Sequence, residues 1–206
     1  IARDLPIGNG QIYTLPPYDH DALMIEARLM LEWYVPHRLG RTATMEEEHA
    51  FVALWGELIT ILERSETGLI LRDYHSPNIV WRPERTGTDR LGLVDIQDAL
   101  YGPLSYDVSS LAQDARVTIP EALEHELISA YCAARDVFGS FDEPAFREAY
   151  AITALQRATK ILGIFVRLDK RDGKPDYLKH LPRIEAYVKR ALAHPRLANL
   201  SRFYSS

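Results

Sequence analysis

Hydrophobic residues recur at helical spacing over long parts of the chain, and polar capping residues stand in front of several of these segments. Behind Asp19, which has the chemistry of an N-cap, a strongly apolar segment extends to Pro36, where we expect the helix to end because proline lacks a backbone N–H. Thr44 and Glu47 form a capping box that opens a helix predicted over 45–64. One face of this helix is apolar, through Phe51, Leu54, Trp55, Leu58 and Leu62.

The second half of the chain returns to a helical pattern. Asp142 and Pro144 open a long apolar-periodic segment, and "RDGKPDY" interrupts the pattern behind it. Capping residues and breaks of this kind divide the second half into helices predicted over 105–114, 120–137, 142–168, 180–193 and 196–203.

Three short apolar runs separate the two helical parts, at 69–71, 78–81 and 91–96. Their length is typical of strands, and the polar turn between the last two predicts a hairpin. The first 18 residues are rich in Gly and Pro, and we expect them to be irregular. The predicted fold class is therefore α+β and mostly α-helical, with a small β-hairpin element inside one domain over 19–206.

Net charge limits the classes of partner. The 206 residues carry a formal net charge of -5, with a pI of about 5.8, whereas a nucleic-acid-binding surface is normally basic. We therefore expect no nucleic-acid partner, and we expect a charged substrate to be met by local side chains or a metal. No apolar run reaches the roughly 18 residues of a membrane span, and no signal peptide is visible. The sequence thus predicts a cytoplasmic protein without a membrane partner.

Side chains with hard oxygen ligands border the predicted strands. Asp73 and Asn78 lie five positions apart in "LRDYHSPNIVW", and Asp95 follows Val94 in the third apolar run. Asn and Asp oxygens suit a Mg²⁺ ion that keeps waters and phosphate oxygens in its shell, which leaves Asp73 to accept a proton from a hydroxyl. Phosphoryl transfer to an alcohol needs this division of roles. The competing interpretation is an ordinary turn, since Asp, Asn, Ser and Pro populate turns for backbone reasons alone.

Four segments resemble a known family. "RDYHSPN" is similar to the catalytic loop of the kinase-like phosphotransferases of the aminoglycoside and choline kinase type, and "LVDIQDALYGPLSYDVSSLAQDAR" resembles their metal-binding strand and the helix start after it. "IEARLMLEWYVPHRLG" and "LQRATKILGIFVRLDKRDGKPDYLKHLPR" are closest to the branch that phosphorylates N-acetylmuramate and N-acetylglucosamine at the anomeric hydroxyl. The resemblance covers residues from about 12 to 195.

The resemblance implies a kinase-like C-terminal lobe that uses ATP and Mg²⁺ in cell-wall recycling. Asp73 takes the role of catalytic base, Asn78 and Asp95 become metal ligands, and Asp107 braces the loop. One position departs from the pattern, because Leu71 stands where the family has a His that ties the loop to the metal-binding strand. A leucine can only pack, so we expect the loop to be held through Arg72 or Asp107.

The part of the kinase pattern that covers the nucleotide is not recognisable in this sequence. All five lysines follow Asp73, and Gly8-Asn9-Gly10 is most simply a turn, so no phosphate-pairing Lys or glycine-rich loop stands before the catalytic loop. The chain also opens on Ile1 rather than Met. We therefore expect the C-terminal lobe of a longer protein, with 1–18 as an irregular approach from an N-terminal nucleotide lobe. The fragment alone is expected to bind ATP poorly and to be inactive.

Candidate sugar-binding residues lie on the first and the late helix, and the alternative for each is an ordinary core or surface role. Carboxylates, amides and Arg can bind sugar hydroxyls, aromatic faces can cover the ring, and a cation can pair with the lactyl carboxylate of N-acetylmuramate. Two other functions stay open, namely an aminoglycoside or other small-alcohol phosphotransferase and a non-catalytic pseudokinase or binding lobe. The candidates are Glu26, Trp33, Tyr34, Gln156, Arg157 and Lys160.

Overall fold

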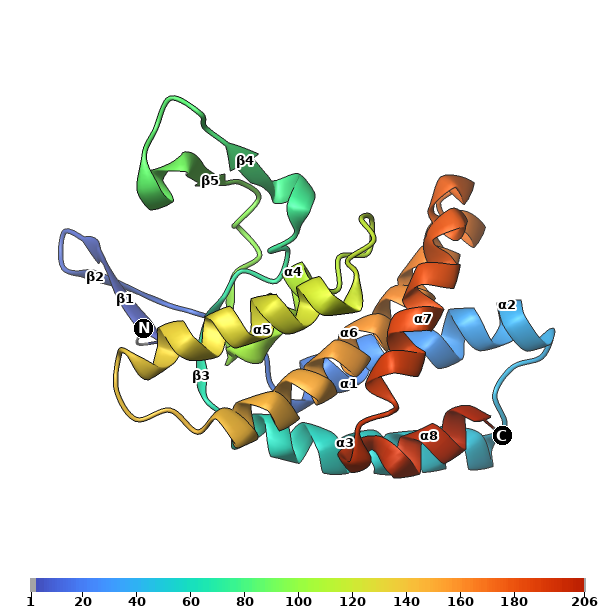
Figure 1. Cartoon of the computed structure of the whole chain (residues 1–206). Coiled ribbons are helices and arrows are strands. Elements are labelled where there is room, and N and C mark those ends of the chain that lie inside the picture. Colours follow the sequence, from blue (N-terminus) through green and yellow to red (C-terminus); the bar gives the residue numbers. More distant parts are fainter. Residues whose placement is uncertain (1–2, 206) are drawn as a thin grey trace.

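The computed structural model describes residues 3–205 and is mostly helical, with three separate two-stranded sheets (Figure 1). The helices are α1 (His20–Leu29), a π-helical turn (Met30–Tyr34), α2 (Val35–Leu39), α3 (Met45–Glu63), α4 (Ser105–Ala112), α5 (Glu121–Asp136), α6 (Glu143–Lys170), α7 (Leu181–Ala191) and α8 (Ala198–Ser205). The strands are β1 (Asp4–Gly8), β2 (Gln11–Thr14), β3 (Thr67–Ile70), β4 (Ile79–Trp81), β5 (Leu91–Leu93) and β6 (Leu100–Pro103). Short 3₁₀ turns cover Ser76–Asn78, Gly87–Arg90, Pro175–His180 and Pro195–Leu197. The α+β class is confirmed.

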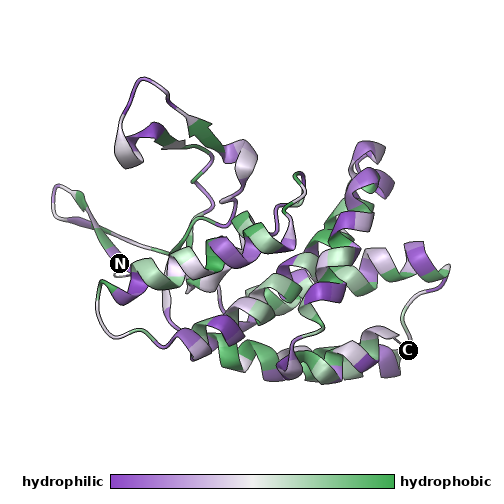
Figure 2. Ribbon diagram, in the orientation of Figure 1, coloured by the Kyte–Doolittle hydropathy of each residue, from purple (hydrophilic) through white to green (hydrophobic). Residues whose placement is uncertain are grey.

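Helix α6 is the centre of the molecule. It packs against α1, the π-helical turn, α4 and α7, and most of its residues between Phe146 and Val166 are buried. Figure 2 shows hydrophobic and hydrophilic residues alternating along the helices, as expected where each helix buries one face. The close approach of α6 to α1 depends on Gly163, because a Cβ there would lie 2.3 Å from the backbone carbonyl of Leu29.

The predicted helix starts at Asp19, Thr44 and Asp142 are confirmed by side-chain caps, and Thr44 with Glu47 forms the full capping box. The predicted helix end at Pro36 is wrong. The chain widens into a π-helical turn just before Pro36, in which the Val35 N–H bonds to the carbonyl of Met30, and it stays helical until Gly40 ends it in the left-handed conformation. The widened turn accommodates the proline, whose missing N–H would otherwise interrupt an α-helix.

The predicted hairpin is confirmed, since β4 and β5 pair antiparallel with Ile79 opposite Leu93. Strand β3 pairs instead with β6, which lies about thirty residues later in the chain. The expectation of an irregular segment over 1–18 is corrected for the described residues, because β1 and β2 form a hairpin around a turn of left-handed residues at Gly8-Asn9-Gly10; residues 1 and 2 lie outside the described part. Within residues 3–205, no helix is long and apolar enough to cross a membrane.

Candidate active site

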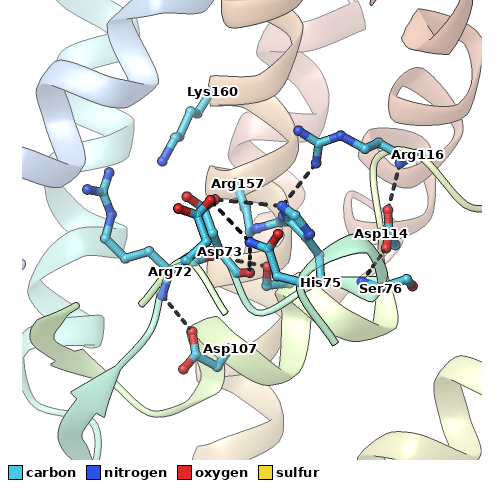
Figure 3. Close-up of polar contacts among 12 residues, drawn as sticks. Arg72, Asp73, His75, Ser76, Asp107, Asp114, Arg116, Arg157 and Lys160 are labelled. Atoms are coloured by element: carbon cyan, nitrogen blue, oxygen red, sulfur yellow. Dashed lines mark hydrogen bonds and ion pairs between the residues drawn. The ribbon is translucent and has the colours of Figure 1, made fainter. Parts of the chain in front are cut away.

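The loop between β3 and β4 carries Asp73, and its backbone is held by the first turn of α4. The carboxylate of Asp107 accepts hydrogen bonds from the N–H groups of Leu71 (2.7 Å) and Arg72 (3.0 Å), and the Ser110 hydroxyl donates to the Arg72 carbonyl at 3.2 Å. Arg72 is in the left-handed region, with φ +65°, where a residue with a Cβ is strained. These contacts fix the point at which the chain turns toward Asp73 (Figure 3).

Asp107 is largely buried, and burial raises the pKa of its carboxyl even though both backbone N–H groups favour the charged form. The hydrogen bonds and the burial therefore act in opposite directions on this group. The geometry agrees with the expectation that Asp107 holds the loop in the absence of a histidine at Leu71.

Asn78 and Asp95 meet at the base of the β4–β5 hairpin. The Asn78 amide donates to the carbonyl of Asp73 at 3.0 Å and lies 3.5 Å from the Asp95 carboxylate. The predicted third strand ends at Leu93, and Asp95 follows in the left-handed conformation with φ +62°. Its other carboxylate oxygen accepts from the Gln97 side chain at 2.7 Å. The Asn78 side chain therefore joins the Asp73 backbone to the Asp95 carboxylate on the other side of the hairpin.

A charged cluster around Glu26 borders the loop on the side of α1 and α6. Glu26 accepts hydrogen bonds from the side chains of Arg72 and Tyr18, and Lys160 Nζ lies 2.9 Å from its Oε1. Lys160 also donates to the Tyr106 hydroxyl at 3.1 Å. Burial opposes the charge of Glu26, but Lys160 and Tyr18 outweigh it and hold the pKa of Glu26 below its ordinary value. The cluster thus ties Arg72 of the loop to two helices.

The opposite side of the loop is braced by Asp114 and lined by His75. The Asp114 carboxylate accepts from the backbone N–H groups of Ser76 (2.8 Å), Arg116 (2.7 Å) and Val117 (3.2 Å). Burial disfavours its charge, but these hydrogen bonds lower the pKa of Asp114. His75 is only 6% exposed, and its Nε2 lies 3.9 Å from Asp73 Oδ1 and 3.0 Å from the Arg116 guanidinium. Figure 3 shows Asp73 between Lys160 on one side and Arg116 on the other.

Comparison with known proteins places this site in a family. A model of the phosphotransferase enzyme family matches residues 14–150, which include the loop, the hairpin and α4. This chain belongs to the phosphotransferase enzyme family. It is 35% identical over 199 residues to a Caulobacter vibrioides protein named N-acetylmuramate/N-acetylglucosamine kinase, covering 95% of this chain and 53% of that protein. Proteins of the same name from Pseudomonas putida and Pseudomonas aeruginosa are 35% and 34% identical, over 90% and 94% of this chain.

The chain spans little more than half the length of these curated relatives, at 53%, 55% and 57% of their residues. The part that it does span contains the whole set of polar residues described above. The family match covers the loop, the hairpin and α4, which are the segments with the resemblance to the kinase-like phosphotransferases.

The other residues predicted to bind the sugar lie in different surroundings. Gln156 is buried and donates to the Leu23 carbonyl at 3.1 Å, and Arg157, 6% exposed, donates to the Gln113 carbonyl at 3.2 Å. Trp33 packs against the main hydrophobic core. Tyr34 donates to Glu185 at 2.6 Å and lines a separate, largely apolar cavity between the π-helical turn, α7 and α8. Of the six candidates, Glu26 and Lys160 are therefore the two that join the charged cluster at the loop.

Sequence reasoning missed Asp114 and Arg116 as members of the site. Both lie in "AQDAR", directly after the end of α4. The signal that could have found them is the position of this segment, because Asp107 was expected to reach the loop from the start of the same helix. Helix α4 has only about two turns, so the segment after it is still close to the loop. Asp107 at its start holds Leu71 and Arg72, and Asp114 just behind its end holds Ser76.

Proposed function

We propose that the whole protein is a Mg²⁺- and ATP-dependent kinase that transfers the γ-phosphoryl group of ATP to a hydroxyl of an amino sugar. The acceptor is N-acetylmuramate or N-acetylglucosamine, phosphorylated at the anomeric hydroxyl in the course of cell-wall recycling. The observation that carries the proposal is the meeting of Asn78 with the Asp73 carbonyl and the Asp95 carboxylate at one loop. The names of the relatives support the choice of acceptor.

In this proposal Asp73 orients the acceptor hydroxyl and accepts its proton as the new bond to phosphorus forms. Its carboxylate is half-buried and faces the space between Lys160 and Arg116 (Figure 3). Its backbone is fixed from below by Asp107 through the neighbouring Arg72. A carboxylate held in this way loses little conformational freedom when the substrate binds.

The residues present fit a magnesium ion. The Asn78 amide nitrogen donates to the Asp73 carbonyl and faces Asp95 Oδ2 at 3.5 Å, so its carbonyl oxygen is the group left to bind a cation. Asp95 supplies a carboxylate on the nitrogen side of the same amide. Among residues 3–205, no three His, Cys, Asp or Glu side chains gather into a metal site, and Mg²⁺ ordinarily takes one or two protein oxygens and completes its shell with water and phosphate. The ion would neutralise phosphate charge during transfer.

We further propose that the chain is the C-terminal lobe of a kinase-like fold and that a nucleotide lobe covers its two hairpins. Both hairpins project from the helical body (Figures 1 and 2). Each carries exposed apolar side chains. Contiguous exposed apolar surface usually marks a face that another unit covers. These side chains are Ile7, Ile12 and Tyr13 on β1–β2, and Val80, Trp81, Leu91 and Leu93 on β4–β5.

Sugar hydroxyls in this proposal are bound by Glu26 and Lys160, the two candidates that lie in the charged cluster beside the loop. The test is a panel of N-acetylmuramate, N-acetylglucosamine and aminoglycosides incubated with the full-length protein, ATP and Mg²⁺, followed by ³¹P NMR of the product. A signal for a sugar 1-phosphate supports the proposal. Phosphorylation of aminoglycosides alone would move the assignment to that class, and no turnover on any acceptor would favour a binding lobe.

A further inference from the structure

Three cations on one side of the loop have no carboxylate partner within ion-pair distance in the described part of the chain, namely Arg116, Lys179 and Arg183. The side-chain contact of Arg116 is with His75, and the contacts of Arg183 are with Thr118, His180 and the Ala115 carbonyl. Arg183 contacts both His180 and the Ala115 carbonyl beside Arg116, and Lys179 directly precedes His180 in the chain. Burial and the three positive charges lower the pKa of His180, against the opposing charge of Asp114. In a chain with a net charge of -5, this local excess of positive charge indicates a site for an anion.

The backbone that carries Arg116 is fixed on both sides. Asp114 accepts from the N–H groups of Arg116 and Val117, and Arg183 donates to the Ala115 carbonyl at 2.9 Å. The Arg116 side chain itself is exposed. An exposed guanidinium on an immobilised backbone is arranged to bind a ligand at a low entropic cost.

The position of Arg116 relative to Asp73 limits which anion it can meet. The Nε2 atom of His75 lies near both groups, 3.9 Å from Asp73 Oδ1 and 3.0 Å from Arg116 Nη1. An anionic group bound to Arg116 is thus near the reacting hydroxyl but displaced from it to the far side of this nitrogen. An acid substituent on one carbon of a sugar, with the reacting hydroxyl on another, has this separation.

The other cations near Asp73 are already engaged. Lys160 pairs with Glu26 at 2.9 Å, and Arg72 pairs with the same carboxylate. Arg157 is buried and donates to a backbone carbonyl. Arg116 is therefore the cation beside Asp73 that is both exposed and free of a carboxylate in the described structure.

We propose that Arg116, supported by Arg183 and Lys179, is a specificity-determining residue that binds the carboxylate of an acidic acceptor sugar. The inference rests on the proposed function and names the part of the substrate that this side of the site recognises. N-acetylmuramate carries a lactyl carboxylate and N-acetylglucosamine does not, so the two sugars report on the site separately. A planar guanidinium binds a carboxylate through two parallel hydrogen bonds.

The test compares Arg116→Ala with wild-type full-length protein on both sugars in a coupled ADP-release assay. Because a hydrogen bond to a charged group is lost, KM for N-acetylmuramate should rise roughly 10- to 100-fold relative to KM for N-acetylglucosamine. Arg116→Lys should recover part of the affinity through its charge. The matched control is Arg64→Ala, which removes an exposed arginine at the end of α3 and should change neither sugar.

An equal loss on both sugars, or no loss on either, would overturn the inference. A rise in KM for ATP would assign Arg116 to phosphate binding and would also overturn it. If the wild-type protein phosphorylates neither sugar, the proposed function fails, but calorimetric titration with N-acetylmuramate still tests the carboxylate site. In that titration, weaker binding to Arg116→Ala than to wild type supports the site, and equal binding contradicts it.

Discussion

Asp107 Oδ1 accepts a 3.0 Å hydrogen bond from the backbone N–H of Arg72, a residue held in the left-handed conformation at φ +65°. An arginine adopts this conformation at a cost, typically about 1–3 kcal/mol for a sparsely populated backbone state. The hydrogen bonds that Asp107 accepts from the loop backbone and the ion pair between Arg72 and Glu26 offset that cost. The loop that carries Asp73 therefore depends on groups outside it for its shape.

Replacing Asp107 by Asn should loosen the loop. The amide oxygen can accept one backbone N–H, but the amide nitrogen faces the other, so a partly buried donor loses its partner at a cost of roughly 1–3 kcal/mol. The free energy of unfolding from urea denaturation measures this loss. Asp98→Asn, at an exposed position of the segment after β5, is the control and should change the free energy by less than about 0.5 kcal/mol. Equal values for the two variants would contradict the bracing role of Asp107.

Glu26→Gln should destabilise the protein more strongly than an ordinary surface change. It leaves Arg72 and Lys160 without their shared carboxylate, and removing one partner of a largely buried ion pair typically costs about 3–5 kcal/mol. Thermal or urea unfolding measures the effect. Adding Lys160→Met to Glu26→Gln removes one uncompensated charge, so the double variant should be less destabilised than the sum of the single variants. Strict additivity would show that the three groups do not act as a unit.

Gly163→Ala should destabilise the protein, although alanine is normally the better helix former. The added Cβ would lie 2.3 Å from the Leu29 backbone, so α1 and α6 must separate, and overpacking of this kind costs about 1–3 kcal/mol. Gly56→Ala in α3 is the matched control. Its Cβ would meet one atom of His20 at 3.8 Å, so this variant should be neutral or more stable. A stabilising effect at both positions would contradict the close contact of α1 and α6.

The sequence predicted the parts of this structure that local chemistry decides. The helix starts at Asp19, Thr44 and Asp142 follow from side chains that accept hydrogen bonds from nearby N–H groups. The grouping of Asp73 with Asn78 followed from their spacing in one loop. The family resemblance, rather than the spacing, pointed to Asp107, and the structure places its carboxylate on the loop backbone.

The features that the sequence did not predict depend on contacts between distant segments. The pairing of β3 with β6 joins strands about thirty residues apart, and no local signal specifies it. The π-helical turn before Pro36 packs against α6. The rule that proline ends a helix takes no account of such a tertiary contact. The sequence suggests Glu26 only as a sugar ligand. Its ion pairs with Arg72 and Lys160 could not be predicted, because they require three separate elements to meet.

His75 should make stability depend on pH between neutral and mildly acidic conditions. Burial and the nearby Arg116 lower its pKa in the folded protein, so the unfolded chain binds a proton at higher pH than the folded chain does. Its contribution to stability is fully present above about pH 6.5, the usual His pKa, and is lost as pH falls toward the lower folded value. Urea unfolding at pH 7.5 and pH 5 measures the loss. His75→Gln should show a smaller loss than wild type, whereas identical losses would contradict the lowered pKa.

The measurement that tests the central claim most directly is the kcat of full-length Asp73→Asn with ATP, Mg²⁺ and N-acetylglucosamine, beside Asp89→Asn as an exposed control in the β4–β5 turn. If Asp73 accepts the proton of the sugar hydroxyl, kcat should fall about 10²–10⁴-fold, while the midpoint of thermal unfolding and the control stay near wild type. A turnover number for Asp73→Asn within a few-fold of wild type would contradict the assignment of the loop as the site of phosphoryl transfer.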